Sequence, residues 1–482
     1  MALTSFSYLL LLFSAVAISI IIPYRYRWII LLIVSIYFYL SFIPSYFLIM
    51  ILLIILNFFG GKMIQGKYKK RILFFIIGLN IGILIVFKYL EFFFSSLLHV
   101  FNIESSELSL SLSLLLPLGL SFVIFQLISY LAEVYKGTIK RERHFGIFSL
   151  SVLFSPKIIA GPIERPQGFL AQLHHKVYIT FPFIISGFKL LSLGFFKKMV
   201  IADRLGVIVD TVYQSPEQYV GVPLIIATLA FTFQLYCDFS GYTDIARGSA
   251  MFFGYDFVEN FRFPYISRSI KEFWRRWHIS LSTWFRDYVY IPLGGNKVSQ
   301  PRHYLNILVS FLLSGLWHGV GWNFVLWGFL HGVGVIASEL IAPSNFLRGN
   351  QFIKILGNIF AWASTFLFIT VTWILFRAQN FSDAWYVFTH ASIGLKSFAF
   401  NLFRNDGSVY DYVFNQGNGL GLPKEQIFIA VIALLLLSIF EFFQARWDRT
   451  NVLIRVSLYI LLVLGIINLS FVYERPFIYV QF

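Results

Sequence analysis

The chain has 482 residues, of which 58% are apolar and only 13% charged, with a formal net charge of +15 and a single cysteine. Soluble chains carry about 25% charged residues, so this composition excludes an ordinary soluble domain. One cysteine excludes an internal disulfide and a thiolate metal cluster, and we predict no metal site. The basic residues stand mostly in short loops between apolar runs, which indicates membrane topology and contact with anionic lipids rather than nucleic acid binding.

Apolar runs long enough to cross a membrane recur along the whole chain. A helix of about 20 residues spans the hydrocarbon core of a bilayer. The predicted helical segments are 5–22, 28–42, 45–60, 72–98, 112–135, 181–203, 221–239, 305–317, 321–340, 353–376, 425–443 and 455–472. The run 147–161 is too short for a full crossing and predicts a re-entrant segment. The fold class is therefore an all-α polytopic membrane protein, with one integral domain over residues 1–482.

The charges of the loops predict the topology. Early loops alternate between basic ones and the loop 102–108, which holds Glu104 and Glu107 and no basic residue. Positive loops stay in the cytoplasm, so the N-terminus is expected outside. The stretch 262–302 has eight Lys or Arg and two acidic residues, and we expect it on the cytoplasmic side, partly in the interface. Lysines within 181–203 should face protein or a cavity.

Two tryptophan–histidine pairs, Trp277-His278 and Trp317-His318, are the strongest candidates for chemistry. A charged side chain at membrane depth costs roughly 2.5–3.5 kcal/mol on insertion scales, so ionisable groups there usually belong to a pathway or a site. Histidine is also the side chain best suited to move a proton near neutral pH. The alternative for each histidine is a buried imidazole bonded to a backbone carbonyl.

Residues 273–290 predict a single amphipathic helix beside the first pair. Apolar and aromatic residues recur at i, i+3 and i+4, and those that share the face are Trp274, Trp277, His278, Leu281, Phe285 and Tyr288. Arg275, Arg276 and Ser282 fall outside this face, where the arginines of an interfacial helix reach water. We therefore expect His278 on the buried side.

Two carboxylates and a third histidine are weaker candidates. Asp238 and Asp244 follow an apolar run, and such a pair can do acid–base chemistry or orient a histidine. The alternative is a polar helix break whose carboxylates pair with nearby arginines. His331 lies between Gly328 and Gly332, a small-xxx-small pair that predicts close helix packing. His331 is therefore a candidate either for the site or for packing behind it.

Seven short motifs, in this order along the chain, resemble those of the membrane-bound O-acyltransferase family, most nearly its bacterial alginate O-acetylation branch. The motifs are Ile159-Ala160-Gly161-Pro162, Asp238-Phe239-Ser240-Gly241-Tyr242-Thr243-Asp244, Glu272-Phe273-Trp274-Arg275-Arg276-Trp277-His278-Ile279-Ser280-Leu281-Ser282, Arg286-Asp287-Tyr288, Leu293-Gly294-Gly295-Asn296, Gly315-Leu316-Trp317-His318-Gly319 and Trp373-Ile374-Leu375-Phe376-Arg377-Ala378.

The resemblance implies a ring of about 11–13 transmembrane or re-entrant helices around a funnel or tunnel, with the catalytic motifs in about residues 230–335. His318 matches the family's catalytic histidine, and His278 matches a second motif position that is asparagine in many eukaryotic members. The remaining residues expected to line the tunnel or the substrate are Trp277, Trp317, Asp238, Tyr242, Asp244, Arg275, Arg276, Ser282, Asn323 and His331.

The activity implied by the resemblance is transfer of an acyl group, here acetyl, from a cytoplasmic thioester to a hydroxyl. Acetyl-CoA or another acyl thioester would be the donor substrate, with no bound cofactor. The acetyl group would pass outward for O-acetylation of alginate, another exopolysaccharide or peptidoglycan, with an extracytoplasmic partner such as an SGNH-like acetyltransferase. The chain would lie in the bacterial cytoplasmic membrane.

Two other functions remain open on the residues alone. A transporter or flippase of a polysaccharide precursor would use the intramembrane histidines as a proton relay. No inverted repeat or matching pair of broken helices is visible in the sequence to favour it. A structural channel for a partner that does all the chemistry is the third hypothesis, and it predicts that His318 can change if its bulk is kept.

Overall fold

The computed structural model describes residues 1–42, 44–90, 92–94, 96, 117, 119–159, 161–341, 351–396, 398, 413–414, 419–444, 451–471 and 475–480. Every regular element within these ranges is a helix. Glu104, Glu107 and Ala160, which the sequence analysis used, lie outside them. Contacts divide the chain into two compact units, Met1–Leu191 with Thr243–Glu259, and Ser192–Tyr242 with Asn260–Phe482.

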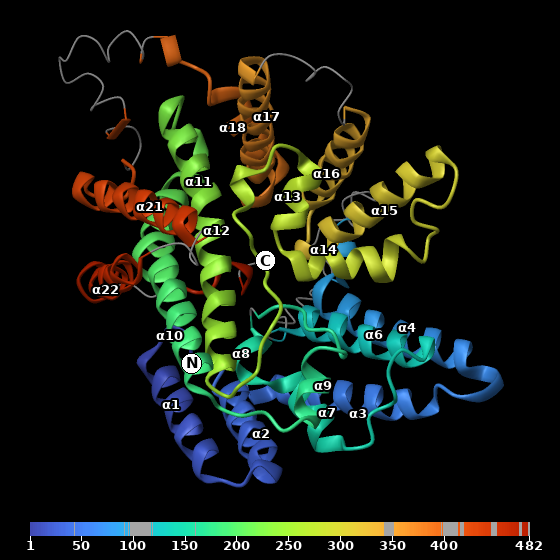
Figure 1. Ribbon diagram of the computed structural model, residues 1–482. Coiled ribbons are helices and arrows are strands. Elements are labelled where there is room, and N and C mark those ends of the chain that lie inside the picture. The colour runs from blue at the N-terminus through green and yellow to red at the C-terminus, as the bar shows by residue number, and fades with distance from the viewer. Residues whose placement is uncertain are drawn as a thin grey trace, which may run out of the picture. The chain divides into compact units, whose positions relative to one another are not determined.

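The first unit contains the N-terminal helices, and Figure 1 shows α3, α4 and α6 side by side. Its helices are α1 (Phe6–Ile21), α2 (Tyr24–Leu40), α3 (Phe47–Met63), α4 (Lys69–Lys88), α6 (Leu120–Lys136), α7 (Phe145–Leu153), α8 (Ser155–Ile158), α9 (Phe169–His174), most of α10 (Phe181–Phe195) and the end of α12 (Val222–Met251). A buried amide pair joins α3 to α4, because Asn57 and Asn80 exchange hydrogen bonds of 2.9 and 3.0 Å. Such polar pairs hold apolar helices together where burial of apolar surface gives little.

The second unit contains both tryptophan–histidine pairs. Its elements are the π-helical η3 (Phe196–Ala202), α11 (Asp203–Tyr213), most of α12, α13 (Ile270–Arg276), α14 (Ile279–Phe285), the π-helical η6 (Arg286–Tyr290), α15 (Gln300–His318), α16 (Trp322–Leu340), α17 (Gln351–Arg377), α18 (Phe381–His390), α21 (Lys424–Gln444), α22 (Val452–Leu469) and η9 (Ile478–Val480). Lys197 and Lys198 of η3 are buried, which confirms that these two lysines of the stretch 181–203 face protein, whereas Lys189 is half-buried.

Two glycines let α15 and α16 pack backbone against backbone. A Cβ at Gly315 would lie 2.3 Å from the carbonyl oxygen of Phe324, and one at Gly328 would lie 2.4 Å from that of Phe311. Either side chain would push the helices apart. The close helix packing predicted at Gly328 is confirmed, and it fixes the C-terminal turn of α15, which ends at His318.

Seven helices in the described part of the chain are long and apolar enough to cross a membrane. They are Pro44–Met63, Gly66–Lys88, Val222–Met251, Trp322–Leu340, Gln351–Arg377, Lys424–Phe443 and Val452–Leu469. The shorter α1 is also apolar. The prediction of an all-α polytopic protein is confirmed, whereas the ring of 11–13 helices stays a prediction.

One alternative from the sequence is wrong: no helix break occurs around Asp238. The helix α12 continues without interruption from Val222 to Met251, well past the predicted end at residue 239. Local polarity favoured a break, but Asp238 and Asp244 are both buried, and the charge of Asp238 is paired inside the protein with Lys198 at 2.7 Å. The run 147–161 contains only the two short helices α7 and α8, as expected of a segment too short to cross.

Candidate functional site

The backbone breaks at His278, so the single helix predicted over 273–290 is wrong. The helix α13 ends at Arg276 and α14 begins at Ile279. His278 has φ 42° and ψ 54°, a left-handed conformation that few non-glycine residues adopt but in which histidine is enriched. The side chains predicted to share a buried face are nevertheless inside, with Tyr288 half-buried and the others buried: Trp274, Trp277, His278, Leu281 and Phe285.

Asn260 stabilises this break from a segment eighteen positions earlier. Its carbonyl accepts the Ile279 N–H at 3.0 Å and its Oδ1 accepts the Ser280 N–H at 3.1 Å. These bonds satisfy two amides that the start of α14 cannot pair internally. The same Oδ1 lies 3.4 Å from His278 Nδ1, which favours the tautomer with its proton on Nδ1 and its lone pair on Nε2. Burial lowers the pKa of His278 to about 3, so the imidazole is neutral near pH 7.

His318 ends α15 inside an aromatic enclosure and is only 3% exposed. Ring centroids lie 4.9 Å away for Trp317, 5.0 Å for Trp327, 5.3 Å for Phe376 and 5.7 Å for Tyr479. These rings come from α15, α16, α17 and the C-terminal segment 475–480. Four separate parts of the chain therefore fix the place of one imidazole.

Both histidines belong to one group of rings, here called the histidine cluster: Phe239, His278, Trp317, His318 and Tyr479. The Trp317 ring lies 6.2 Å from that of His278 and 4.9 Å from that of His318. On another side, Phe239 contacts His278 at 4.7 Å and Tyr479 at 4.5 Å. The fold thus brings together two tryptophan–histidine pairs that stand forty positions apart in the sequence.

A buried ion cluster anchors the C-terminal segment beside the histidine cluster. Lys198 Nζ lies 2.7 Å from an oxygen of Asp203 and 2.7 Å from one of Asp238, and all three side chains are at most 5% exposed. The second oxygen of Asp238 accepts the Ile478 N–H at 2.8 Å. Asp238 therefore pairs with a lysine rather than with the arginines considered from sequence, and it holds the residue next to Tyr479.

His331 lies behind the histidine cluster with both ring nitrogens in hydrogen bonds. Its Nδ1 accepts the Trp274 Nε1–H at 3.2 Å, and its Nε2–H donates to Thr372 Oγ1 at 3.1 Å. The ring also lies 4.6 Å from that of Trp327, which contacts His318. An indole donor facing Nδ1 requires the neutral tautomer.

His331→Leu should destabilise the protein by about 1–3 kcal/mol for each buried polar group left without its partner. His331→Gln can still accept from Trp274 and donate to Thr372, so it should retain most of the stability. Thermal unfolding of both variants in detergent measures the difference. Equal losses in the two variants would show that ring packing, not the hydrogen bonds, is what His331 contributes.

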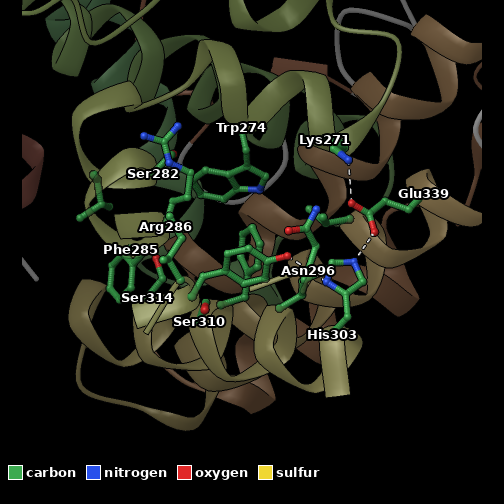
Figure 2. A pocket seen from close by; sticks show the side chains of 16 residues that line it. Lys271, Trp274, Ser282, Phe285, Arg286, Asn296, His303, Ser310, Ser314 and Glu339 are labelled. Atoms are coloured by element: carbon green, nitrogen blue, oxygen red, sulfur yellow. Dashed lines mark hydrogen bonds and ion pairs between the residues drawn. The ribbon is translucent and has the colours of Figure 1, made fainter. Parts of the chain in front are cut away.

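A cavity of about 620 Å³ opens between α13, α14, η6, α15 and α16, all within the second unit (Figure 2). Figure 2 shows Lys271, Glu339 and His303 together on one side of it, where Glu339 bonds Lys271 at 2.6 Å and His303 at 2.8 Å. Tyr290 OH extends this chain to His303 Nδ1 at 2.9 Å. The residues that line the cavity include Trp274, Leu281, Ser282, Phe285, Arg286, Ile307, Ser310, Phe311, Ser314 and Val335.

Two residues that line this cavity lie four positions along the chain from the two histidines. Ser282 follows His278 by four positions, and its N–H and hydroxyl both donate to the His278 carbonyl, at 3.0 and 3.2 Å. Ser314 precedes His318 by four positions on α15, so the two share a helix face. The helix faces that line the cavity therefore continue into the histidine cluster.

The other predicted residues have varied surroundings. Trp277 packs on Trp373 at 5.2 Å, and Tyr242 packs on Phe477 at 4.5 Å next to the anchored segment. Asn323 is buried and donates to the Ala378 carbonyl at 3.1 Å. The remaining three have other surroundings: Arg275 is exposed, Arg276 pairs with Glu272 at 2.9 Å, and Asp244 is buried on the part of α12 that belongs to the first unit.

Three residues around the site were not found from the sequence as site residues. Lys198 was expected only to face protein or a cavity. Asn260 and Tyr479 carried no signal, because each acts through a contact with a distant segment. Within the described ranges, no group of three His, Cys, Asp or Glu side chains is placed to hold a metal ion.

Comparisons with known proteins identify the family of this chain. A model of the membrane-bound O-acyltransferase family matches residues 147–377. A protein named probable alginate O-acetylase from Pseudomonas putida is 34% identical over 95% of both chains. A peptidoglycan O-acetyltransferase from Helicobacter pylori is 35% identical over 73% of this chain and 71% of the relative. A teichoic acid D-alanyltransferase from Streptococcus thermophilus is 31% identical over 47% of this chain and 58% of the relative.

These relatives are named for acyl transfer and give no support to the transporter hypothesis. The similarity to the alginate O-acetylase extends over nearly the whole chain, including both tryptophan–histidine pairs within the family match. With seven membrane-length apolar helices in the described ranges and this family membership, the protein is a multi-pass membrane protein. The chain belongs to the membrane-bound O-acyltransferase family and is an O-acyltransferase.

Proposed function

We propose that this enzyme transfers an acetyl group from a cytoplasmic thioester toward hydroxyl groups of a cell-surface polysaccharide, such as alginate, another exopolysaccharide or peptidoglycan. The names of relatives at 34–35% identity support acetyl as the acyl group and a polysaccharide as the final acceptor. The observation on which the proposal depends most is the convergence of His278 and His318 in one buried cluster.

His318 acts as the general base in this proposal. A neutral imidazole takes the proton of the acceptor hydroxyl, the hydroxyl oxygen attacks the thioester carbonyl, and the carbon–sulfur bond breaks. The departing thiolate recovers the proton from the imidazolium. The rings around His318 support this role, because they exclude water that would hydrolyse the thioester or compete for the base.

His278 orients one of the reactants. Its Nδ1 faces Asn260, and in the tautomer that this contact favours, Nε2 is a hydrogen-bond acceptor that suits the acceptor hydroxyl. A neutral imidazole can do this without the cost of a buried charge. Trp277 and Trp317 hold the two histidines in place. Asp238 and Tyr242 contribute indirectly, because they position the C-terminal segment that carries Tyr479.

The cavity gives the donor a route to the histidines. Its lining includes the cations Lys271 and Arg286, the half-buried Ser282 one turn from His278, and the buried Ser314 one turn from His318. A long, narrow thioester arm fits that passage better than a polysaccharide. Ser282 lies at its inner end, and exposed cations of 262–302, such as Arg275, Lys297 and Arg302, attract the donor's phosphates. Acetyl-CoA or an acetylated carrier protein satisfies these requirements.

The enzyme would work in the bacterial cytoplasmic membrane with a partner on the outer face. An SGNH-like acetyltransferase, or another glycan-modifying protein, would receive the acetyl group and complete its transfer to the polysaccharide. We treat residues 1–482 as one integral domain, because two continuous helices, α10 and α12, each contribute to both compact units. Anionic membrane lipids bind the basic stretch 262–302.

The test is acetyl transfer by purified protein in liposomes, with radiolabelled acetyl-CoA on one side only. We expect thioester loss when the donor faces the basic stretch, and label on the opposite side when a candidate outer-face partner is present. Donor on the other side should give no turnover. Absence of turnover with donor on either side, even with a partner and a carrier-protein thioester, would overturn the proposal.

A further inference from the structure

The aromatic enclosure of His318 also limits what can react beside it. The imidazole is 3% exposed, and Trp327 and Phe376 face it from α16 and α17 at centroid distances of 5.0 and 5.3 Å. Trp327 and Phe376 are fully buried and cannot turn outward without exposing their rings. An acyl group whose carbonyl lies beside His318 therefore meets rings within a few ångströms.

Other aromatic rings pack around the Phe376 ring. Its centroid lies 5.2 Å from Phe324, 5.3 Å from Trp373 and 5.4 Å from Trp327. Buried rings packed in this way have few low-energy positions to move into. Phe376 is thus a rigid wall rather than a flexible cover.

Of the residues that enclose His318, Phe376 is also the one whose substitution should disturb the rest of the structure least. Trp327 packs on His331 and Trp373 as well as on His318, and Tyr479 depends on the anchored C-terminal segment. Phe376 has no polar atom in its side chain, so its substitution breaks no hydrogen bond. Removing part of its ring creates space next to His318.

We propose that Phe376, with Trp327, sets the length of the acyl group and restricts this enzyme to the two-carbon acetyl group. The inference rests on the proposed role of His318 in acetyl transfer. A donor with two further methylene groups, butyryl-CoA, would have to displace Phe376 to bring its carbonyl to His318. One methylene misplaced in an apolar pocket changes selectivity by roughly 10–200-fold.

The experiment measures kcat/KM for acetyl-CoA and butyryl-CoA with the reconstituted enzyme. The wild type should prefer acetyl by at least roughly tenfold. Phe376→Leu should narrow this preference at least fivefold, mainly by faster use of butyryl-CoA. Phe376→Met frees a volume similar to that freed by the leucine change, but its flexible chain can repack around the gap, so it should narrow the preference even if the leucine variant folds poorly.

Phe366→Leu is the matched control. It makes the same change on α17, but its ring packs on Tyr265 at 5.7 Å and on Phe233 at 6.2 Å. Its acetyl preference should equal that of the wild type. Equal use of acetyl and butyryl by the wild type, or an unchanged preference in both Phe376 variants, would overturn the inference. If the wild type shows no acetyl turnover that depends on His318, the proposed function itself is overturned. Failure of the inference and failure of the proposed function therefore give different results.

Discussion

His318→Ala should lower kcat for acetyl transfer by roughly 10²–10⁴, the usual contribution of a general base. His318→Gln should lose a similar factor, because glutamine keeps much of the bulk and a hydrogen bond but cannot take a proton. The four rings that enclose the imidazole, those of Trp317, Trp327, Phe376 and Tyr479, are not bases that could take the proton in its place near pH 7. Single-turnover thioester loss in detergent, with folding followed by thermal unfolding, measures the effect.

His390→Ala is the control for this prediction. His390 stacks on Tyr386 of α18 at 3.8 Å and has no part in the proposed mechanism, so its loss should leave kcat unchanged. Near-normal kcat in His318→Gln would favour the channel hypothesis, in which only the bulk of the side chain matters. Near-normal kcat in His318→Ala would remove His318 from the chemistry altogether.

Lys198→Met should cost about 3–5 kcal/mol of unfolding free energy, because it leaves two buried carboxylates without their cation. Asp203 and Asp238 are each 2.7 Å from Lys198 Nζ, and neither side chain is more than 5% exposed. Asp238 also holds the Ile478 N–H, so the C-terminal segment should detach at the same time. Thermal unfolding in detergent measures the first effect, and limited proteolysis after residue 475 the second.

A neutralising second change should restore part of this loss. In Lys198→Met with Asp203→Asn, one of the two stranded carboxylates becomes a neutral amide, so unfolding should require more heat than in Lys198→Met alone. Lys297→Met, at an exposed lysine, should unfold like the wild type. If Lys198→Met is as stable as Lys297→Met, the carboxylates are held by something other than Lys198.

Most helices could be predicted from the sequence, which also proposed the two histidines as candidate site residues. Apolar runs gave most helices to within a few residues, because a membrane leaves helix as the main way to pair the backbone. The buried state of Lys198 followed from the cost of charge in an apolar segment. His278 and His318 attracted attention for the same reason, and their motifs also pointed to the family.

The geometry of the site could not be predicted from the sequence, because it depends on contacts between distant segments. The break at His278 depends on hydrogen bonds to Asn260. The periodicity of residues 273–290 contains no information about a residue outside that window. The helix α12 continues through Asp238 because Lys198, forty positions earlier, removes the cost of burying its charge. Tyr479 reaches His318 only because Asp238 holds the neighbouring Ile478.

The left-handed backbone at His278 has a consequence for how substitutions there are chosen. At φ 42° the main chain favours glycine, asparagine, aspartate or histidine, and it penalises β-branched residues most. An alanine at this position therefore removes an imidazole and strains the chain in one step. Asparagine separates the two effects, since it accepts the same backbone and lacks only the ring.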